Sequence, residues 1–468
     1  MIRCLCLLVA IVGLWPGESG AQSASQAAPQ SFTLDGALQY AVEHYPSVRA
    51  ALEQVNTSVA NLDVAASSYL PRFDVLWQTN RATTNNVFGQ LLPQSVIPAL
   101  SGPVLPFTSM DGVWGSAAGG LFSWEPVDLG LRGAVVRESQ AALARARADA
   151  GLTRLTVQYA VGQAFLTAVS AQQAMAAADA DVQRRDVLAR AAHTLVDNQL
   201  RPGAEASRAD AELAAARTRA LQARQAQAVS QATLAQMLGV TAGQVEVNPR
   251  QVLGGAPAEA TAAAAPEHPL LEISQAAVDV ARAREDVLAK TDRPRLYLQS
   301  SVFARGTGAH ADGSVEGGAG GLGLERANWA AGVQVVVPNL FDFAPLRARR
   351  AAASATTRAE VARHDEAALT VTAQQRTADA VVDLARAIAQ NTPVQLAAAQ
   401  QSEAQARARY DAGLASIVEV AEAQGLLAAA EYQNAMARVD VWKALLAQAA
   451  SHGSLDPFIG LARGAGVP

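Results

Sequence analysis

The chain has 468 residues and a formal net charge of -5; half of its residues are hydrophobic, but only 5% are aromatic and 17% are charged. The mildly acidic balance, without runs of lysine or arginine, argues against a nucleic-acid partner and against a basic tail that would hold an anionic membrane surface. Because alanine takes the place of larger side chains, we expect helices that pack closely through thin contacts.

Residues 1–21 have the composition of a secretory signal peptide. Arg3 supplies the positive start, residues 4–15 form an apolar run, and residues 19–21 are the small residues of a cleavage site. The apolar run is too short for a spanning helix, which needs about 20 residues; the alternative is an uncleaved anchor. Both cysteines lie in this segment, so a mature chain beginning at Gln22 would have no disulfide, catalytic thiol or Cys-bound metal.

A helix interrupted at Pro46 is predicted first, over residues 34–70. Thr33 followed by Asp35 is a typical helix start. Pro71 ends the helix, because proline has no backbone N–H to continue the hydrogen bonding.

Strict alternation of apolar and polar residues then predicts a strand over residues 73–80. Phe73 and Trp77 would face one way, and Asp74 and Gln78 the other. A loop rich in Gly, Asn, Thr and Pro follows over residues 82–111. A return strand is predicted over residues 114–124, with small residues on the face opposite Phe122 and Trp124.

Residues 129–198 are rich in Ala, Arg, Gln and Leu and contain little glycine, which is typical of a helix. Between residues 152 and 169 the apolar positions follow coiled-coil heptad spacing. A continuous helix of about 70 residues would be roughly 100 Å long. A turn at residues 200–203 leads into a shorter returning helix that ends at Gly239, and residues 240–266, rich in Ala, Pro and Gly, form a linker.

The second half of the chain repeats this order. Matching residues recur at two fixed spacings: Pro46 and Pro269, Pro71 and Pro294, Asp128 and Asp342, Asp197 and Asp411, and Gly239 and Gly453. We interpret the chain as a duplicated unit. Its predicted divisions are residues 22–239 as the first repeat, 240–267 as a linker or equatorial segment, 268–453 as the second repeat and 454–468 as a C-terminal tail.

The second unit is predicted to contain a helix over residues 270–291, strands over 296–302 and 329–337, and a long helix over 345–412. A turn at residues 413–416 leads into its returning helix. Such long hairpins cannot pack into one globule, so the sequence predicts an elongated rod or tube.

The four predicted strands are close to the 9–11 residues that cross a bilayer when tilted. Aromatic residues gather in or beside them, as in the aromatic belts of membrane barrels: Phe73, Trp77, Trp114, Phe122, Trp124 and Trp329. The alternative is a small soluble sheet with aromatic packing. Because the smallest membrane barrels have about eight strands, the membrane interpretation requires several chains to share one barrel.

This doubled order of strands, junctions and hairpins resembles the TolC family of outer-membrane efflux and secretion channels, over roughly residues 32–453. The family's junction, Pro-aliphatic-Phe-Asp-x-Gly, is matched in part at residues 126–130, which lack the Phe. It is also matched at residues 338–344, where Ala344 replaces the glycine.

The resemblance implies a mainly α fold with a β-barrel part. Long coiled-coil hairpins and four strands per chain would close in a homotrimer as a 12-stranded barrel above a helical tunnel. It implies a Gram-negative outer-membrane location extending into the periplasm, contact with outer-membrane lipid, and two partners: a periplasmic adaptor (membrane fusion protein) and an inner-membrane pump.

Catalytic motifs are not indicated. The six histidines are scattered, without a His-x-x-x-His spacing. The glycine-rich residues 317–321 lack the Lys-Ser/Thr of a phosphate-binding loop, and no Gly-x-Ser-x-Gly elbow occurs. The sequence therefore predicts no enzyme, no catalytic residue, no cofactor and no bound metal.

Glu419 and Glu422 lie one helical turn apart and would point the same way. The resemblance implies that they ring the periplasmic constriction, where carboxylates around one axis would favour cations. Glu205 takes the equivalent place in the first unit, and Arg208 stands where Glu422 would be. The alternative is that these acids complement a helix dipole, worth about 0.3–1 kcal/mol each; for Glu205 we prefer that alternative.

The two turns lie farthest from the strands and are predicted to expose small or apolar residues to the adaptor. The predicted contact residues are Leu200, Arg201, Pro202, Gly203, Gly413, Leu414, Ala415 and Ser416. A passive channel of a tripartite efflux or type I secretion system is the favoured function, and a periplasmic coiled-coil adaptor or scaffold is the alternative. Drugs, metal ions, solvents and secreted proteins all stay open as cargo.

Overall fold

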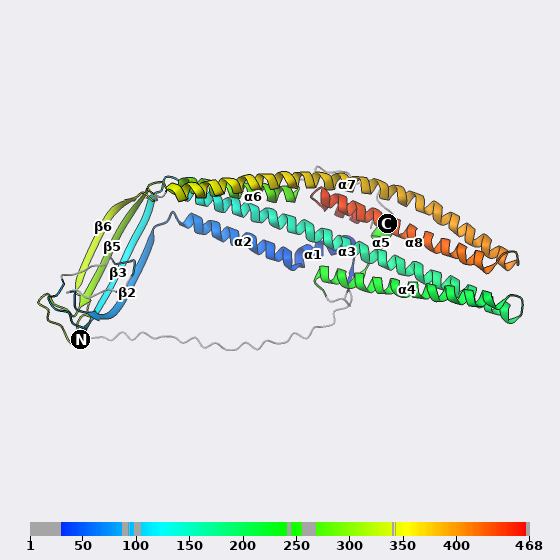
Figure 1. The fold of residues 1–468 in the computed structure, drawn as a ribbon, viewed down its shortest axis with the longest axis horizontal. Helices are drawn as coiled ribbons and strands as arrows, with labels where there is room; N and C mark the ends of the chain where they lie inside the picture. The colour runs from blue at the N-terminus through cyan, green and yellow to red at the C-terminus, as the bar shows by residue number, and fades with distance from the viewer. Residues whose placement is uncertain are drawn as a thin grey trace.

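The computed structural model describes residues 30–86, 92, 94–97, 104–240, 245–254, 268–338, 341 and 343–464. The predicted signal peptide, much of the linker and Asp342 of the second junction lie outside these residues. The molecule is elongated, with a β-sheet at one end and helical hairpins extending away from it (Figure 1). Among the described residues, none of the helices has the length and apolar character needed to cross a membrane.

The sheet has four antiparallel strands in the order β2-β3-β5-β6. They are β2 (Arg72–Thr83), β3 (Gly112–Val127), β5 (Arg295–Thr307) and β6 (Arg326–Val336). All four begin or end beyond the alternating segments from which they were predicted, because backbone pairing continues past the amphipathic part. Within the described sheet, β2 and β6 are the edges.

The strand register confirms the predicted alternation and gathers the tryptophans and most of the exposed apolar residues on one face. Phe73 is opposite Phe122, and Val302 is opposite Trp329. The ring of Phe73 also lies over Gly120, where an added Cβ would meet it at 2.8 Å. This apolar face comprises Phe73, Val75, Trp77, Trp114, Phe122, Trp124, Leu296, Leu298, Val302, Trp329, Val333 and Val335. Trp77 is 71% exposed and Trp329 is 78% exposed.

Proline divides the first helical segment where it was expected to. Helix α1 (Leu34–His44) is capped by Thr33, whose hydroxyl accepts a hydrogen bond from the Gly36 N–H at 3.3 Å. Pro46 then starts α2 (Pro46–Ser67), since a proline at the first helical position loses no intrahelical bond. The second unit has one such helix, α6 (Pro269–Lys290), which also begins with proline.

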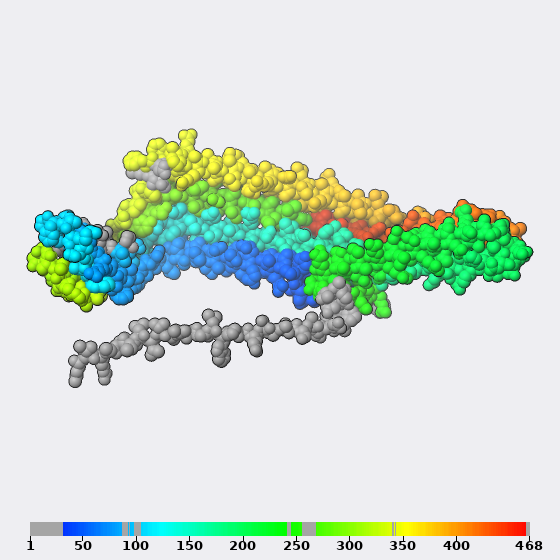
Figure 2. Space-filling model, turned by 60° about the horizontal axis from the view of Figure 1, so that its bottom comes forward, coloured from blue at the N-terminus to red at the C-terminus, as the bar shows by residue number. Residues whose placement is uncertain are grey.

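Two hairpins form the long body. The first consists of α3 (Leu131–Asp197) and α4 (Gly203–Leu238), and the second of α7 (Phe343–Asp411) and α8 (Ile417–Ser451). The sequence predicted one continuous helix over this segment without considering Pro393. Helix α7 does continue through this proline. Helix α3 contacts α2, α4, α6 and α8, whereas α7 contacts α6 and α8. In Figure 2, α1 and α2 are followed by α4 along one flank.

The largest core lies midway along the molecule, where both hairpins meet shorter elements. These are β1 (Gln30–Phe32), which pairs in parallel with β4 (Val245–Val247), α5 (Arg250–Leu253) and α9 (Asp456–Gly464). Trp442 is fully buried here, and its indole N–H donates to the Val252 carbonyl at 3.0 Å. The described part of the predicted linker is therefore packed against the helices.

Candidate functional site

The two hairpin turns lie at the end of the molecule farthest from the sheet (Figure 1). Leu200 is 68% exposed and Leu414 is 71% exposed. Each turn has a left-handed residue, Gln199 in the first and Gly413 in the second. The expectation that the tips expose small or apolar residues is wrong for Ala415, which is buried because it packs in a cluster with Ile417 and other apolar side chains.

A polar contact joins the two hairpins close to their turns. The Tyr410 hydroxyl donates to a Glu205 carboxylate oxygen at 3.4 Å, and Arg201 lies 3.6 Å from the other oxygen. The Arg201 guanidinium also lies 5.1 Å from the centre of the Tyr410 ring. Burial raises the pKa of Tyr410, and the neighbouring Glu205 raises it further. Glu205 is thus paired with Arg201 rather than with Arg208. The contact with Tyr410 was not predicted, because a single tyrosine in a helix forms no sequence motif or periodic pattern.

Glu419 closes a capping box at the start of α8. The Ser416 hydroxyl accepts from the Glu419 N–H at 3.5 Å, and the Glu419 carboxylate accepts from the Ser416 N–H at 3.3 Å. Arg409 lies 3.3 Å from the second carboxylate oxygen. Glu419 and Glu422 are both exposed. Glu419 therefore caps the start of α8, as the alternative interpretation holds. The role of Glu419 and Glu422 in a periplasmic constriction stays a prediction.

Buried charges join α3 to α4 some distance from the turns. Arg185 contacts both oxygens of Asp181 through Nε at 3.1 Å and Glu212 through Nη1 at 2.7 Å. Arg219 adds a contact of 3.0 Å to Asp181. The Asp181 and Arg185 side chains are 5% and 4% exposed. Their four-residue spacing, typical of helix ion pairs, is the signal by which the sequence could have revealed them.

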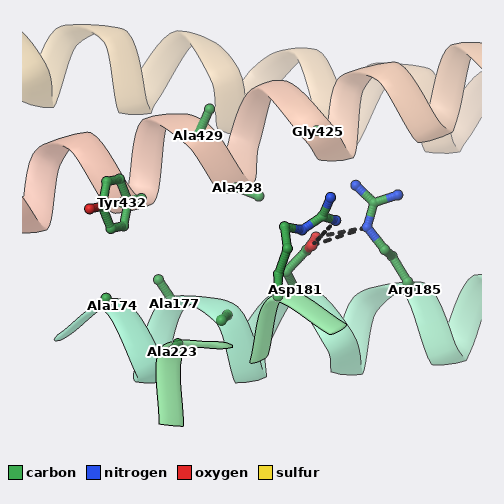
Figure 3. A pocket seen from close by; sticks show the side chains of 11 residues that line it. Ala174, Ala177, Asp181, Arg185, Ala223, Gly425, Ala428, Ala429 and Tyr432 are labelled. Atoms are coloured by element: carbon green, nitrogen blue, oxygen red, sulfur yellow. Dashed lines mark hydrogen bonds and ion pairs between the residues drawn. The ribbon is translucent and has the colours of Figure 1, made fainter. Parts of the chain in front are cut away.

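Three of these charged residues, Asp181, Arg185 and Arg219, line a pocket of about 400 Å³ between the two hairpins. Figure 3 shows Asp181 and Arg185 on α3 beneath the α8 segment that carries Gly425 and Ala428. The other lining residues are mostly alanines, with Tyr432 at one end. Because these side chains are so small, they leave the space between the helices unfilled.

The junction between β3 and α3 is held by Asp128. Its carboxylate accepts from the backbone N–H groups of Gly130, at 3.0 Å, and Arg132. Arg132 returns a side-chain contact to Asp128 and donates to the Ser68 carbonyl at 3.1 Å. Burial alone would raise the pKa of Asp128, but the hydrogen bonds from Arg132 and Gly130 lower it. Gly130 has φ +94°, which explains the glycine of the junction motif.

Sites for metal chemistry are not formed by the described residues, where no group of three or more His, Cys, Asp or Glu side chains could hold an ion. The functional features of the described chain are therefore an apolar sheet face, two exposed turns and charged contacts between helices.

Comparison with known proteins agrees with this architecture. Residues 262–454 match the outer membrane efflux protein family. The chain is thus similar to the outer-membrane channels of the TolC family. It is 26% identical over 429 residues to protein CyaE of Bordetella pertussis, covering 90% of this chain and 83% of that one. The resemblance inferred from the doubled element order is thereby confirmed, and the chain is an outer-membrane protein that extends into the periplasm.

Solved structures have the same fold. The CmeC outer membrane channel of Campylobacter jejuni has a TM-score of 0.72 at 16% identity, with 99% of this chain and 98% of that one covered. The outer membrane protein VceC of Vibrio cholerae has a TM-score of 0.71 at 16% identity, with 90% and 97% covered.

Proposed function

We propose that this protein is the outer-membrane channel of a tripartite efflux or type I secretion system. It is a passive conduit, without catalytic activity, for substrates delivered by an inner-membrane pump and a periplasmic adaptor. The observation that carries the proposal is the sheet, which presents a continuous apolar face and is joined end to end with helical hairpins. A lipid-facing sheet on a periplasmic tube suits a conduit better than a soluble scaffold.

The sheet edges support a homotrimer. Lipid cannot satisfy the open backbone groups of an edge strand, so β2 and β6 need partner strands in a membrane. Three chains with four strands each would supply 12 strands, enough to close a barrel. Pairing of β2 with the β6 of a neighbouring copy would leave no edge open.

The flanks of the helical body support the same assembly. Leu369, Leu384 and Ile388 are exposed on α7, and Leu221 and Val229 are exposed on α4. Helices α7 and α4 lie on opposite sides of the hairpin end (Figure 1). Two different apolar flanks fit a head-to-tail contact, which closes into a ring when the rotation between copies allows it.

The exposed turns are the proposed adaptor contacts. Leu200 and Leu414 present apolar side chains at the far end of the tube, where a partner spanning the periplasm would meet it. The first turn presents Arg201 and Pro202, whereas the second presents Gly413 and Leu414. The two docking surfaces therefore differ in charge and shape.

Fractionation and conductance together test this function. The protein should be recovered from the outer membrane after a salt wash and should form ion-conducting pores in planar bilayers. Recovery in the soluble periplasmic fraction, with no conductance from the purified protein, would instead favour the coiled-coil adaptor or scaffold.

A further inference from the structure

A short segment between β2 and β3, residues 94–97, folds back onto the sheet; we call it the hook. The Gln94 side chain holds its shape. Its carbonyl oxygen accepts from the backbone N–H groups of Val96, at 2.5 Å, and Ile97, at 2.8 Å. Its amide donates back to the Ile97 carbonyl at 2.6 Å. The hook is therefore a turn organised by its own first side chain.

The hook packs on the face of the sheet opposite the apolar face. Val96 and Ile97 are 8% and 2% exposed and form one buried cluster with Ala117 and Phe303. Ala118 is paired with Trp77, so Ala118 shares the apolar face and Ala117 points the other way. Leu76 and Leu121, which are partly buried against the cluster, also point that way.

The sheet is shaped to receive the hook. Gly119 is directly opposite Phe303, and a Cβ on Gly119 would lie only 2.5 Å from the Phe303 Cβ. The absence of a side chain at Gly119 therefore leaves room for Phe303 to lie against the sheet. Aromatic residues often cover a glycine on the neighbouring strand in this way. Beside the hook, a pocket of about 440 Å³ is lined by residues that include Val96, Gln299 and Gln334. The hook thus covers part of a face that also carries polar and charged residues, among them Gln299, Asp74 and Arg305.

We propose that the hook narrows the outer half of the pore and sets an upper limit on the size of the cargo. This inference rests on the proposed function, because the face that holds the hook becomes a lumen only when the sheet closes into a barrel. Ala117 lies in the half of β3 that is farther from the helices. Three copies of the hook would project into one passage, and their bulk would limit the size of what can pass.

Cysteine labelling tests where the hook lies. Ala117→Cys places a thiol beneath it, and Ala118→Cys is the matched control on the apolar face; the chain's own cysteines both lie within residues 1–21. A water-soluble maleimide should label Ala117→Cys about tenfold faster when Val96→Ser and Ile97→Ser are added, because the hook then opens more often. The same two changes should leave the labelling of Ala118→Cys unaltered. Equal rates for Ala117→Cys with and without them would overturn the placement of the hook.

Polymer exclusion tests whether the hook restricts passage. Polyethylene glycols of graded size are added on the extracellular side of a bilayer that contains the channel. The Val96→Ser/Ile97→Ser variant should admit larger polymers than the wild type, seen as a fall in conductance. An unchanged size limit would overturn the role of the hook while leaving the channel function intact. Absence of conductance from the wild type would instead overturn the proposed function, on which this role depends.

Discussion

At the scale of single residues, Glu419 has two separable roles. Its carboxylate caps α8 through the Ser416 N–H, and its charge is predicted to contribute, with Glu422, to a ring of acids. Glutamine serves as well as glutamate at this position of a capping box, so Glu419→Gln removes the charge and keeps the cap.

We expect Glu419→Gln with Glu422→Gln to weaken cation selectivity without loss of thermal stability, because six carboxylates would disappear from a shared passage. The reversal potential in a salt gradient measures the selectivity. Ser416→Ala is the control for the cap and should cost about 0.5–2 kcal/mol of stability with selectivity unchanged. If the glutamine variant keeps the selectivity of the wild type, the two glutamates do not line the passage and act only as surface and capping charges.

His268 makes stability depend on pH. Its Nδ1 accepts from the Leu270 N–H at 3.1 Å, and its ring donates to the Ala450 carbonyl, so the neutral form fits the site. Burial lowers its pKa below the ordinary value of 6.5; the hydrogen bond to the Ala450 carbonyl and the charge of Glu272 oppose this shift, and the nearby His452 adds to it. The unfolded chain therefore takes up a proton first as the pH falls. This contribution to stability is complete above about pH 6.5 and is lost below it.

The unfolding temperature of the wild type should therefore fall more between about pH 7.5 and pH 5.5 than that of His268→Asn. Asparagine also caps helices but does not titrate in this range. Circular dichroism of the detergent-solubilised proteins gives both values. A parallel fall in the two proteins would assign the pH dependence to other groups.

Which side chains meet across the hairpins could not be predicted from the sequence. Tyr410 and Glu205 are far apart in the chain, and their contact depends on how the turn ends of the two hairpins meet. Ala415 was expected at an exposed tip, yet a buried cluster encloses it. Periodicity defines the face of a helix but not its neighbour, so exposure at a turn depends on tertiary packing.

At the scale of helices and strands, most boundaries follow from local chemistry. Alternation predicted the faces of the four strands, and prolines marked where α2 and α6 begin. The hook was not predicted, because a four-residue segment held by one glutamine side chain has no periodicity.

The buried charges between α3 and α4 provide a prediction at this scale. Arg185→Leu leaves Glu212 without its 2.7 Å contact and Asp181 with only Arg219 as a charged partner. Breaking a buried pair costs about 3–5 kcal/mol. Arg190→Leu is the matched control on the same helix, because Arg190 is 74% exposed in its pair with Asp186 and such pairs contribute about 0–1 kcal/mol. Thermal unfolding should separate the two variants, and equal losses would contradict a structural role for the buried network.

At the scale of the whole molecule, the chain divides its chemistry by location. Large apolar and aromatic side chains, tryptophans among them, are exposed on the sheet, whereas the hairpins expose alanines and polar residues with apolar side chains such as Leu221 and Leu369 between them. The predicted aromatic belt thus lies on an exposed face of the sheet. That division is what a protein needs when one end meets lipid and the rest meets water.

This division leads to the last prediction, which uses two neighbouring residues of β6. Val333 is 66% exposed on the apolar face, and Gln334 is paired with Tyr297 and points the other way. If the apolar face meets lipid, Val333→Arg should cost about 2–4 kcal/mol near the bilayer centre. Gln334→Arg should cost much less, because its side chain would reach a water-filled lumen. The fraction of protein recovered as folded trimers from the outer membrane measures the difference. Equal recovery of the two variants would show that this face does not contact lipid. The proposal that three chains share one membrane barrel would then be wrong.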